Sequence, residues 1–131
     1  MSIPLWCLLI GVILPYVWAA VSVPFRAKQL GTVDLAQPRL QAAELTEAGA
    51  GAWGAQMNQW ENLSVFMAAT LAAHMQGVDP AGSWATASMI WVFARVAHGA
   101  FYVMGIPPLR VAGFVTGVAM SIWIFVMALT A

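Results

Sequence analysis

Four long apolar stretches, separated by shorter polar segments, dominate the chain. They cover residues 3–25, 51–75, 80–104 and 108–129. Each is long enough to cross a hydrocarbon core about 30 Å thick as an α-helix. The pattern therefore predicts an all-α fold, an integral membrane four-helix bundle of antiparallel transmembrane helices, built as a single domain over residues 1–131.

Charged residues and prolines mark the predicted ends of these helices. Arg26 and Lys28 follow the first stretch and are expected to stop it at an interface of the membrane. Residues 26–50 form the only long polar segment, which is predicted to be partly helical and to lie near the membrane surface. Asp79 is the predicted N-cap of the third helix, and Pro80 is its predicted first residue.

Composition supports a location in the membrane. Hydrophobic residues make up 62% of the 131 residues and charged residues 8%, whereas an average soluble domain has about 25% charged residues. The formal net charge is zero, so no nucleic-acid partner is expected. Cys7 is the one cysteine, and its apolar surroundings predict an inert thiol.

Basic residues predict the topology. Arg26, Lys28 and Arg39 lie in the first loop and Arg110 lies in or beside the third, while the second loop carries only Asp79. The positive-inside rule then places the first and third loops in the cytoplasm and both termini on the other side of the membrane.

Chemically active side chains gather in one layer of the predicted bundle. Arg95, His98 and Tyr102 share one face of the third helix, at positions i, i+3 and i+7. An arginine at the centre of a membrane helix costs about 2.5–3.5 kcal/mol, so it needs a partner or a polar cavity. The topology brings polar residues of the second helix to a similar depth: Gln56, Asn58 and Glu61. Glu61 is the expected ion-pair partner of Arg95.

Two interpretations of this layer are open from the residues alone. An intramembrane Glu–Arg pair with amide neighbours can serve only to hold helices together. His98 would then be a core histidine, Tyr102 an interface anchor and Arg110 a topology charge. Alternatively, the co-location of so many polar types indicates a functional site. The sequence has no HExxH, P-loop, GxGxxG, CxxC or GxSxG motif, and no metal site is expected.

The order of these motifs resembles a known family. Asn58-x-x-Glu61, followed by Arg95-x-x-His98-x-x-x-Tyr102 and Arg110, is similar to the MAPEG superfamily (membrane-associated proteins in eicosanoid and glutathione metabolism). The stretch 95–98 is similar to microsomal prostaglandin E synthase, and 55–61 to leukotriene C synthase and bacterial members; the microsomal glutathione transferases are further relatives. The resemblance covers nearly the whole chain.

The resemblance implies a homotrimer of four-helix subunits, with glutathione sites between neighbours that open towards the cytoplasm. The residues that would bind glutathione are Gln56, Asn58, Glu61, Arg95, His98 and Tyr102. Arg110 would be catalytic, because a guanidinium near the thiol of glutathione favours its thiolate form. Tyr102 would join it, and Arg26 would be a second catalytic arginine, with Lys28 as the alternative.

One position departs from the family pattern. Family members commonly carry an arginine just upstream of the amides of the second helix, where this chain reads Gly51-Ala52-Trp53-Gly54-Ala55.

The leading hypothesis for the function is a glutathione-dependent transferase or peroxidase of the bacterial inner membrane, with periplasmic termini and a lipophilic substrate. The missing arginine favours a rival, a non-enzymatic lipid-binding or scaffold trimer. A small four-helix exporter is the third hypothesis, although Glu61, its required free carboxylate, has Arg95 available to pair.

Overall fold

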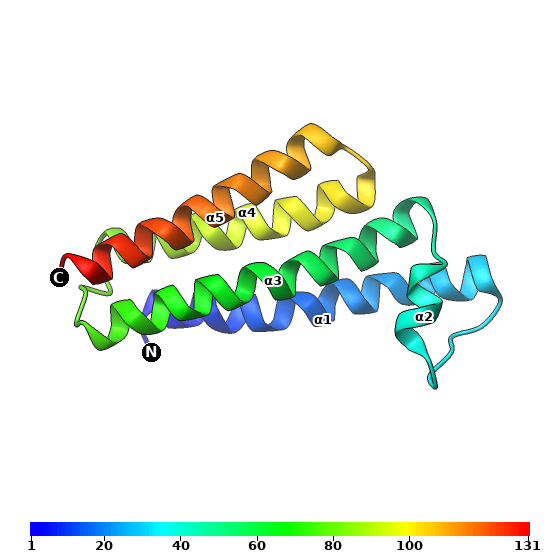
Figure 1. Cartoon of the computed structure of the whole chain (residues 1–131), viewed down its shortest axis with the longest axis horizontal. Coiled ribbons are helices and arrows are strands. Elements are labelled where there is room, and N and C mark those ends of the chain that lie inside the picture. The colour runs from blue at the N-terminus through cyan, green and yellow to red at the C-terminus, as the bar shows by residue number, and fades with distance from the viewer.

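The computed structural model describes all residues 1–131, and every regular element in it is a helix. The elements are α1 (Ile3–Leu30), α2 (Pro38–Ala43), α3 (Glu47–Met75), α4 (Ser83–Met104) and α5 (Pro107–Leu129). The long helices α1, α3, α4 and α5 lie side by side, and the short α2 covers one end of α1 and α3 (Figure 1).

Three of the long helices are apolar enough to cross a membrane, namely α1, α4 and α5. The fourth, α3, has a similar length of 29 residues, but amides and Glu61 in its first half make it less hydrophobic. The all-helical membrane fold is thus confirmed, whereas a fourth crossing by α3 stays a prediction. In its favour, α3 runs alongside α1 for most of its length (Figure 1).

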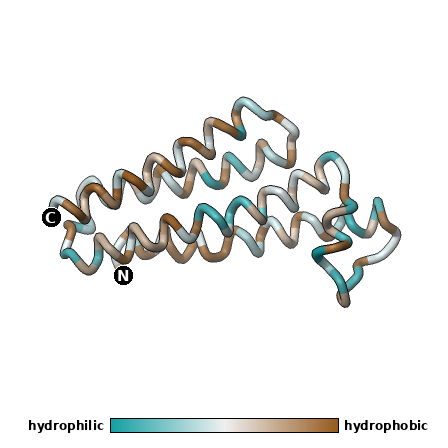
Figure 2. Tube along the Cα trace, in the orientation of Figure 1, coloured by the Kyte–Doolittle hydropathy of each residue, from teal (hydrophilic) through white to brown (hydrophobic).

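The two ends of the bundle differ in polarity. Both termini lie at one end, whereas α2 and the turn between α4 and α5 lie at the other (Figure 1). Figure 2 shows hydrophilic residues concentrated around α2, with a second polar zone midway along α3 and α4. Arg26, Lys28, Arg39 and Arg110 all belong to helix segments at the end with α2, and the orientation of that end in the membrane stays a prediction.

The end of α1 differs from the prediction. The helix continues to Leu30, so Arg26 and Lys28 lie inside it instead of beyond it. Long basic side chains can remain on a helix near the interface because their charged heads reach the polar layer. The actual stop is Gly31, whose φ of 77° is the left-handed conformation that glycine adopts at helix C-termini.

The start of α4 also differs from the prediction. The helix begins at Ser83, with Gly82 as its N-cap, and Asp79 and Pro80 lie in the preceding turn. The Asp79 carboxylate accepts a hydrogen bond from the backbone N–H of Ala81 at 3.0 Å. Asp79 therefore stabilises the turn, as aspartate does when it bonds to the backbone two residues on, and does not cap the helix.

Close packing of aromatic rings and glycines sets the helix positions. Trp91 of α4 stacks on Phe66 of α3 with 3.9 Å between ring centroids. Further along α4, Gly99 faces Trp18 of α1 so closely that an added Cβ would enter the indole ring. The α1–α4 contact beside the polar layer therefore depends on the absence of a side chain at Gly99.

Candidate functional site

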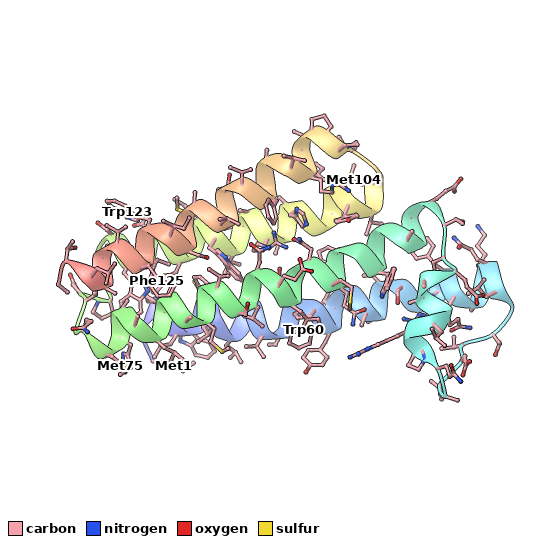
Figure 3. All side chains as sticks on the ribbon, viewed as in Figure 1. Met1, Trp60, Met75, Met104, Trp123 and Phe125 are labelled. Carbon is pink, nitrogen blue, oxygen red and sulfur yellow. The ribbon has the colours of Figure 1, made fainter.

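Arg95 anchors the polar layer from the middle of α4. Its side chain is fully buried, with 0% of its surface exposed. Its Nε donates a hydrogen bond to Gln59 Oε1 at 2.9 Å, and its Nη2 donates to Asn58 Oδ1 at 2.7 Å. Gln59 in turn donates to the carbonyl oxygen of Gly11 at 3.3 Å. These hydrogen bonds form one network that joins α1, α3 and α4. Side chains that carry nitrogen and oxygen are visible between α3 and α4 in Figure 3.

The predicted Glu61–Arg95 ion pair does not form. No carboxylate oxygen of Glu61 lies within 4.0 Å of the guanidinium. Instead, Asn58 stands between them: its Oδ1 accepts from Arg95, and its Nδ2 donates to Glu61 Oε2 at 3.3 Å. The physical reason is the orientation of α3, which turns Asn58 and Gln59 towards α4 and leaves Glu61 on its exposed face.

His98 connects α4 to the first turn of α5. Its side chain is 3% exposed, and its Nδ1 lies 2.8 Å from the carbonyl oxygen of Arg110. A carbonyl oxygen can only accept, so Nδ1 carries the proton. The second ring nitrogen, Nε2, is buried without a partner in the chain. The hydrogen bond fixes the backbone of Arg110 relative to α4.

Tyr102 and Arg110 are stacked at the edge of this layer. The guanidinium carbon of Arg110 lies 4.5 Å from the centre of the Tyr102 ring, within the range of a cation–π interaction. The ring also lies against Gly54 of α3, where an added Cβ would lie 2.7 Å from Tyr102 Cε1 and Cζ. The phenol ring therefore contacts both α3, at Gly54, and the first turn of α5, at Arg110.

These side chains open onto a small cavity between α3, α4 and α5. It measures about 210 Å³ and is lined by Asn58, His98, Tyr102, Arg110, Val111 and Phe114. The lining combines polar and cationic groups with the apolar side chains of Val111 and Phe114. Such a lining suits a ligand that carries both a carboxylate or thiolate and an apolar portion.

Two of the predicted site residues lie elsewhere. Arg26 and Gln56 line a separate cavity of about 370 Å³ between α1, α2 and α3. The reason is helical geometry, because Gln56 precedes Asn58 by two residues and so projects from a different face of α3. The structure brings the other six predicted residues into one network and cavity: Asn58, Glu61, Arg95, His98, Tyr102 and Arg110.

Sequence reasoning missed Gln59, the main acceptor for Arg95. The signal is present in the pattern, because Gln59 lies four residues after Ala55 and seven before Phe66, both of them buried. A helix repeats its faces at these spacings. A polar residue on such an inward stripe needs a buried partner, which makes it a candidate for pairing with Arg95.

Comparison with known proteins gives one match. The model of the MAPEG family matches residues 3–130, which include all five helices and both cavities. No curated protein and no solved structure matches the chain. The family match covers nearly the whole sequence and includes the buried Arg95 network. The chain belongs to the MAPEG family.

Proposed function

We propose that the chain is a glutathione-dependent transferase or peroxidase that acts on a lipophilic substrate. The observation that carries this proposal is the stacking of Arg110 on Tyr102 beside Asn58 and His98, around one cavity of a MAPEG chain. His98 lines the same cavity, and its Nε2 is a buried acceptor without a partner in the chain, which a donor group of a ligand would satisfy.

Each group has a chemical role in the proposal. The Arg110 guanidinium favours the thiolate form of a nearby thiol, and stacking on Tyr102 holds it in place. The Tyr102 hydroxyl can donate a hydrogen bond to the sulfur, and the Glu61 carboxylate suits the ammonium group of glutathione. Arg95 acts through others, because it fixes the Asn58 amide that faces the cavity. Bound glutathione would supply the sulfur nucleophile or the reducing thiol.

A homotrimer is part of the proposal. The cavity of about 210 Å³ is smaller than the roughly 300–1,000 Å³ of most ligand pockets, so one chain encloses only part of a tripeptide site. Glu61 is exposed on α3, where contact with lipid would be costly and contact with another copy would not. Arg26 and Gln56, which line the other cavity of the chain, would then join the site from a neighbouring copy.

The proposed location is a bacterial inner membrane with both termini in the periplasm. It is supported by three apolar helices and by the basic residues at the end of the bundle that carries α2. With this orientation the cavity beside Tyr102 and Arg110 lies towards the cytoplasmic side, since Arg110 is in the first turn of the last helix.

Titration of detergent-purified protein with glutathione tests the proposal. We expect millimolar glutathione to raise the thermal midpoint of the wild type, because a ligand that binds the native state stabilises it. Arg110→Gln should weaken the shift and remove the ultraviolet absorbance of a bound thiolate. S-methylglutathione, which cannot ionise, should bind the wild type and Arg110→Gln with similar affinity. No thermal shift with either ligand would contradict the proposal.

A non-enzymatic lipid-binding or scaffold trimer is the second candidate. The observation that favours it is the stretch Gly51–Ala55, which has no arginine where the family commonly carries one and in which Gly54 lies against the Tyr102 ring. The site therefore has one cation fewer to hold a glutathione carboxylate. In the same titration, this candidate predicts no glutathione response and lipid that remains bound through purification. Family membership gives no support to the small exporter.

A further inference from the structure

Residues 31–46 form a strap that connects α1 to α3 and contains α2 (Figure 1). Polar groups of the strap brace it from within. The Gln41 side chain donates to the Thr32 carbonyl oxygen at 2.8 Å and accepts from the Asp34 backbone N–H at 2.9 Å. The Asp34 carboxylate accepts the backbone N–H of Ala36 at 2.7 Å. Because these bonds lie within the strap, it can keep its shape while it moves relative to the helices.

Few contacts hold the strap against α1 and α3. Its buried apolar side chains are Ala42 and Leu45, which are 1% and 5% exposed. Leu35 and Leu40, by contrast, are 86% and 64% exposed and so do not secure it. Since stabilisation grows with the apolar surface removed from water, the strap is held less firmly than the packed helices.

Two polar side chains of α1 tie the strap down. Gln29 Nε2 donates to the Thr46 carbonyl oxygen at 3.2 Å, and Gln29 Oε1 accepts from the Thr46 backbone N–H at 3.0 Å. Arg26 Nη1 donates to the Pro38 carbonyl oxygen at 2.9 Å. Gln29 and Thr46 are both exposed, so water can replace the bonds between them at a small net cost. The Gln29–Thr46 contact therefore has the properties of a reversible latch.

The backbone is left-handed at both ends of the strap. Gly31 has a φ of 77°, and a Cβ added there would meet nothing within 4 Å, so the chain has room to turn. Glu47 has a φ of 47° and is the one non-glycine residue with a positive φ. A residue with a Cβ adopts this conformation at a cost and keeps it only where surrounding contacts impose it. The observed position of the strap therefore holds strain at Glu47 that a movement would release.

We propose that the strap is a hinged lid, which turns about Gly31 and Glu47 and is closed by the Gln29–Thr46 latch. The latch and the buried apolar side chains favour the closed position, whereas the strain at Glu47 favours the open one. Opening separates the Arg26 guanidinium from the Pro38 carbonyl and exposes the inner side of α2 to water. The movement belongs to the chain without any ligand, so the inference goes beyond the proposed thiol chemistry and does not depend on it.

Thiol labelling of the full chain in phosphatidylcholine nanodiscs tests the movement. The background is Cys7→Ala, which removes the one native thiol. Ala42→Cys then places a thiol on the buried side of α2, and Leu40→Cys places one on its exposed side. The probe is a charged, water-soluble maleimide. We expect the Ala42→Cys chain to react to completion, but about tenfold more slowly than the Leu40→Cys chain, because its reaction requires an opening of the strap.

Variants of the latch and of the hinge should change the labelling rate of the Ala42→Cys chain in opposite directions. Gln29→Leu removes the latch and should raise the rate about fivefold. Lys28→Leu, at the adjacent exposed position, removes no hydrogen bond to the strap and should leave the rate unchanged. Glu47→Gly relieves the strain of the closed position and should lower the rate several-fold. Glu47→Ala, which keeps a Cβ, should not lower it.

Several outcomes would overturn the proposal. Equal rates for the Ala42→Cys and Leu40→Cys chains would show that the strap does not close, and no reaction of the Ala42→Cys chain in any variant would show that it does not open. A rate that Gln29→Leu leaves unchanged would overturn the assignment of the latch. Leu45→Cys, at the second buried position, guards against an effect peculiar to one cysteine: it should respond to Gln29→Leu and Glu47→Gly in the same directions, and opposite responses would exclude a single moving unit.

Discussion

Gln59 on α3 and Arg95 on α4 share a hydrogen bond of 2.9 Å that is wholly buried, since both side chains are 0% exposed. A bond from a guanidinium to an amide oxygen is charge-assisted and therefore stronger than a neutral one. Because Gln59 also donates to the Gly11 carbonyl oxygen, the same amide links α4 to α1. The position and orientation of the Arg95 side chain thus depend on Gln59, which does not line the cavity beside Tyr102 and Arg110.

We predict that Gln59→Leu destabilises the protein by about 2–3 kcal/mol, because it leaves the Arg95 Nε buried without an acceptor. Denaturation in detergent, followed by circular dichroism, measures the loss. Gln56→Leu is the matched control, since Gln56 lies on the same helix and makes no hydrogen bond in the chain. Equal stability of the two variants would contradict the structural role of Gln59.

We predict that Gly99→Ala destabilises the protein although it adds only one methyl group, because that group would enter the Trp18 indole. Such overpacking costs about 1–3 kcal/mol, and more where neither helix can move. The thermal midpoint in detergent measures the effect. Trp18→Leu in the same chain should restore part of the lost stability, since it makes room for the methyl group. A double variant no more stable than Gly99→Ala would contradict this contact.

Much of the fold follows from the sequence. The apolar stretches predict the long helices to within a few residues at most ends, because a span of a membrane has a fixed minimum length. The spacing of Arg95, His98 and Tyr102 places them on one face of α4, and the structure connects His98 to Arg110 and Arg110 to Tyr102. The errors lie at helix ends, where Gly31 and the Asp79 turn decide two boundaries. The predicted start of α3 is also wrong, because the helix begins at Glu47 and includes four residues that were expected in the polar loop.

The inward stripe of α3 makes Gln59 a candidate partner of Arg95, but the sequence alone does not select it, because Asn58, Gln59 and Glu61 are all within reach of an arginine on a neighbouring helix. The choice depends on the rotation of α3 about its own axis, which hydropathy does not report. Close packing of Gly51 and Gly54 against the Tyr102 segment sets that rotation. The same rotation places Gln56 in the cavity of Arg26 and away from Arg110.

We predict that Gly54→Ala weakens glutathione binding without unfolding the protein. The new Cβ would lie 2.7 Å from the Tyr102 ring, which is partly exposed and can move aside. Arg110 then loses its cation–π support, worth about 0.5–2 kcal/mol, so the affinity should fall several-fold. Calorimetric titration measures the affinity. In a Tyr102→Leu background, which lacks the ring, Gly54→Ala should have no further effect, and additive losses would contradict the coupling.

The contact between His98 and Arg110 predicts a difference between two substitutions at one position. His98→Asn keeps an N–H group near the place of Nδ1, whereas His98→Leu removes the donor and leaves the Arg110 carbonyl without it. We expect His98→Leu to cost about 1 kcal/mol and to accelerate hydrogen–deuterium exchange in the turn between α4 and α5 and the first turn of α5. In the His98→Asn variant, the same amides should exchange at nearly the wild-type rate.

Because the turn positions the Arg110 side chain over Tyr102, His98→Leu should also lower the affinity for glutathione, whereas His98→Asn should retain it. Equal exchange in the two variants would show that the ring packing of His98, and not its hydrogen bond, holds the start of α5.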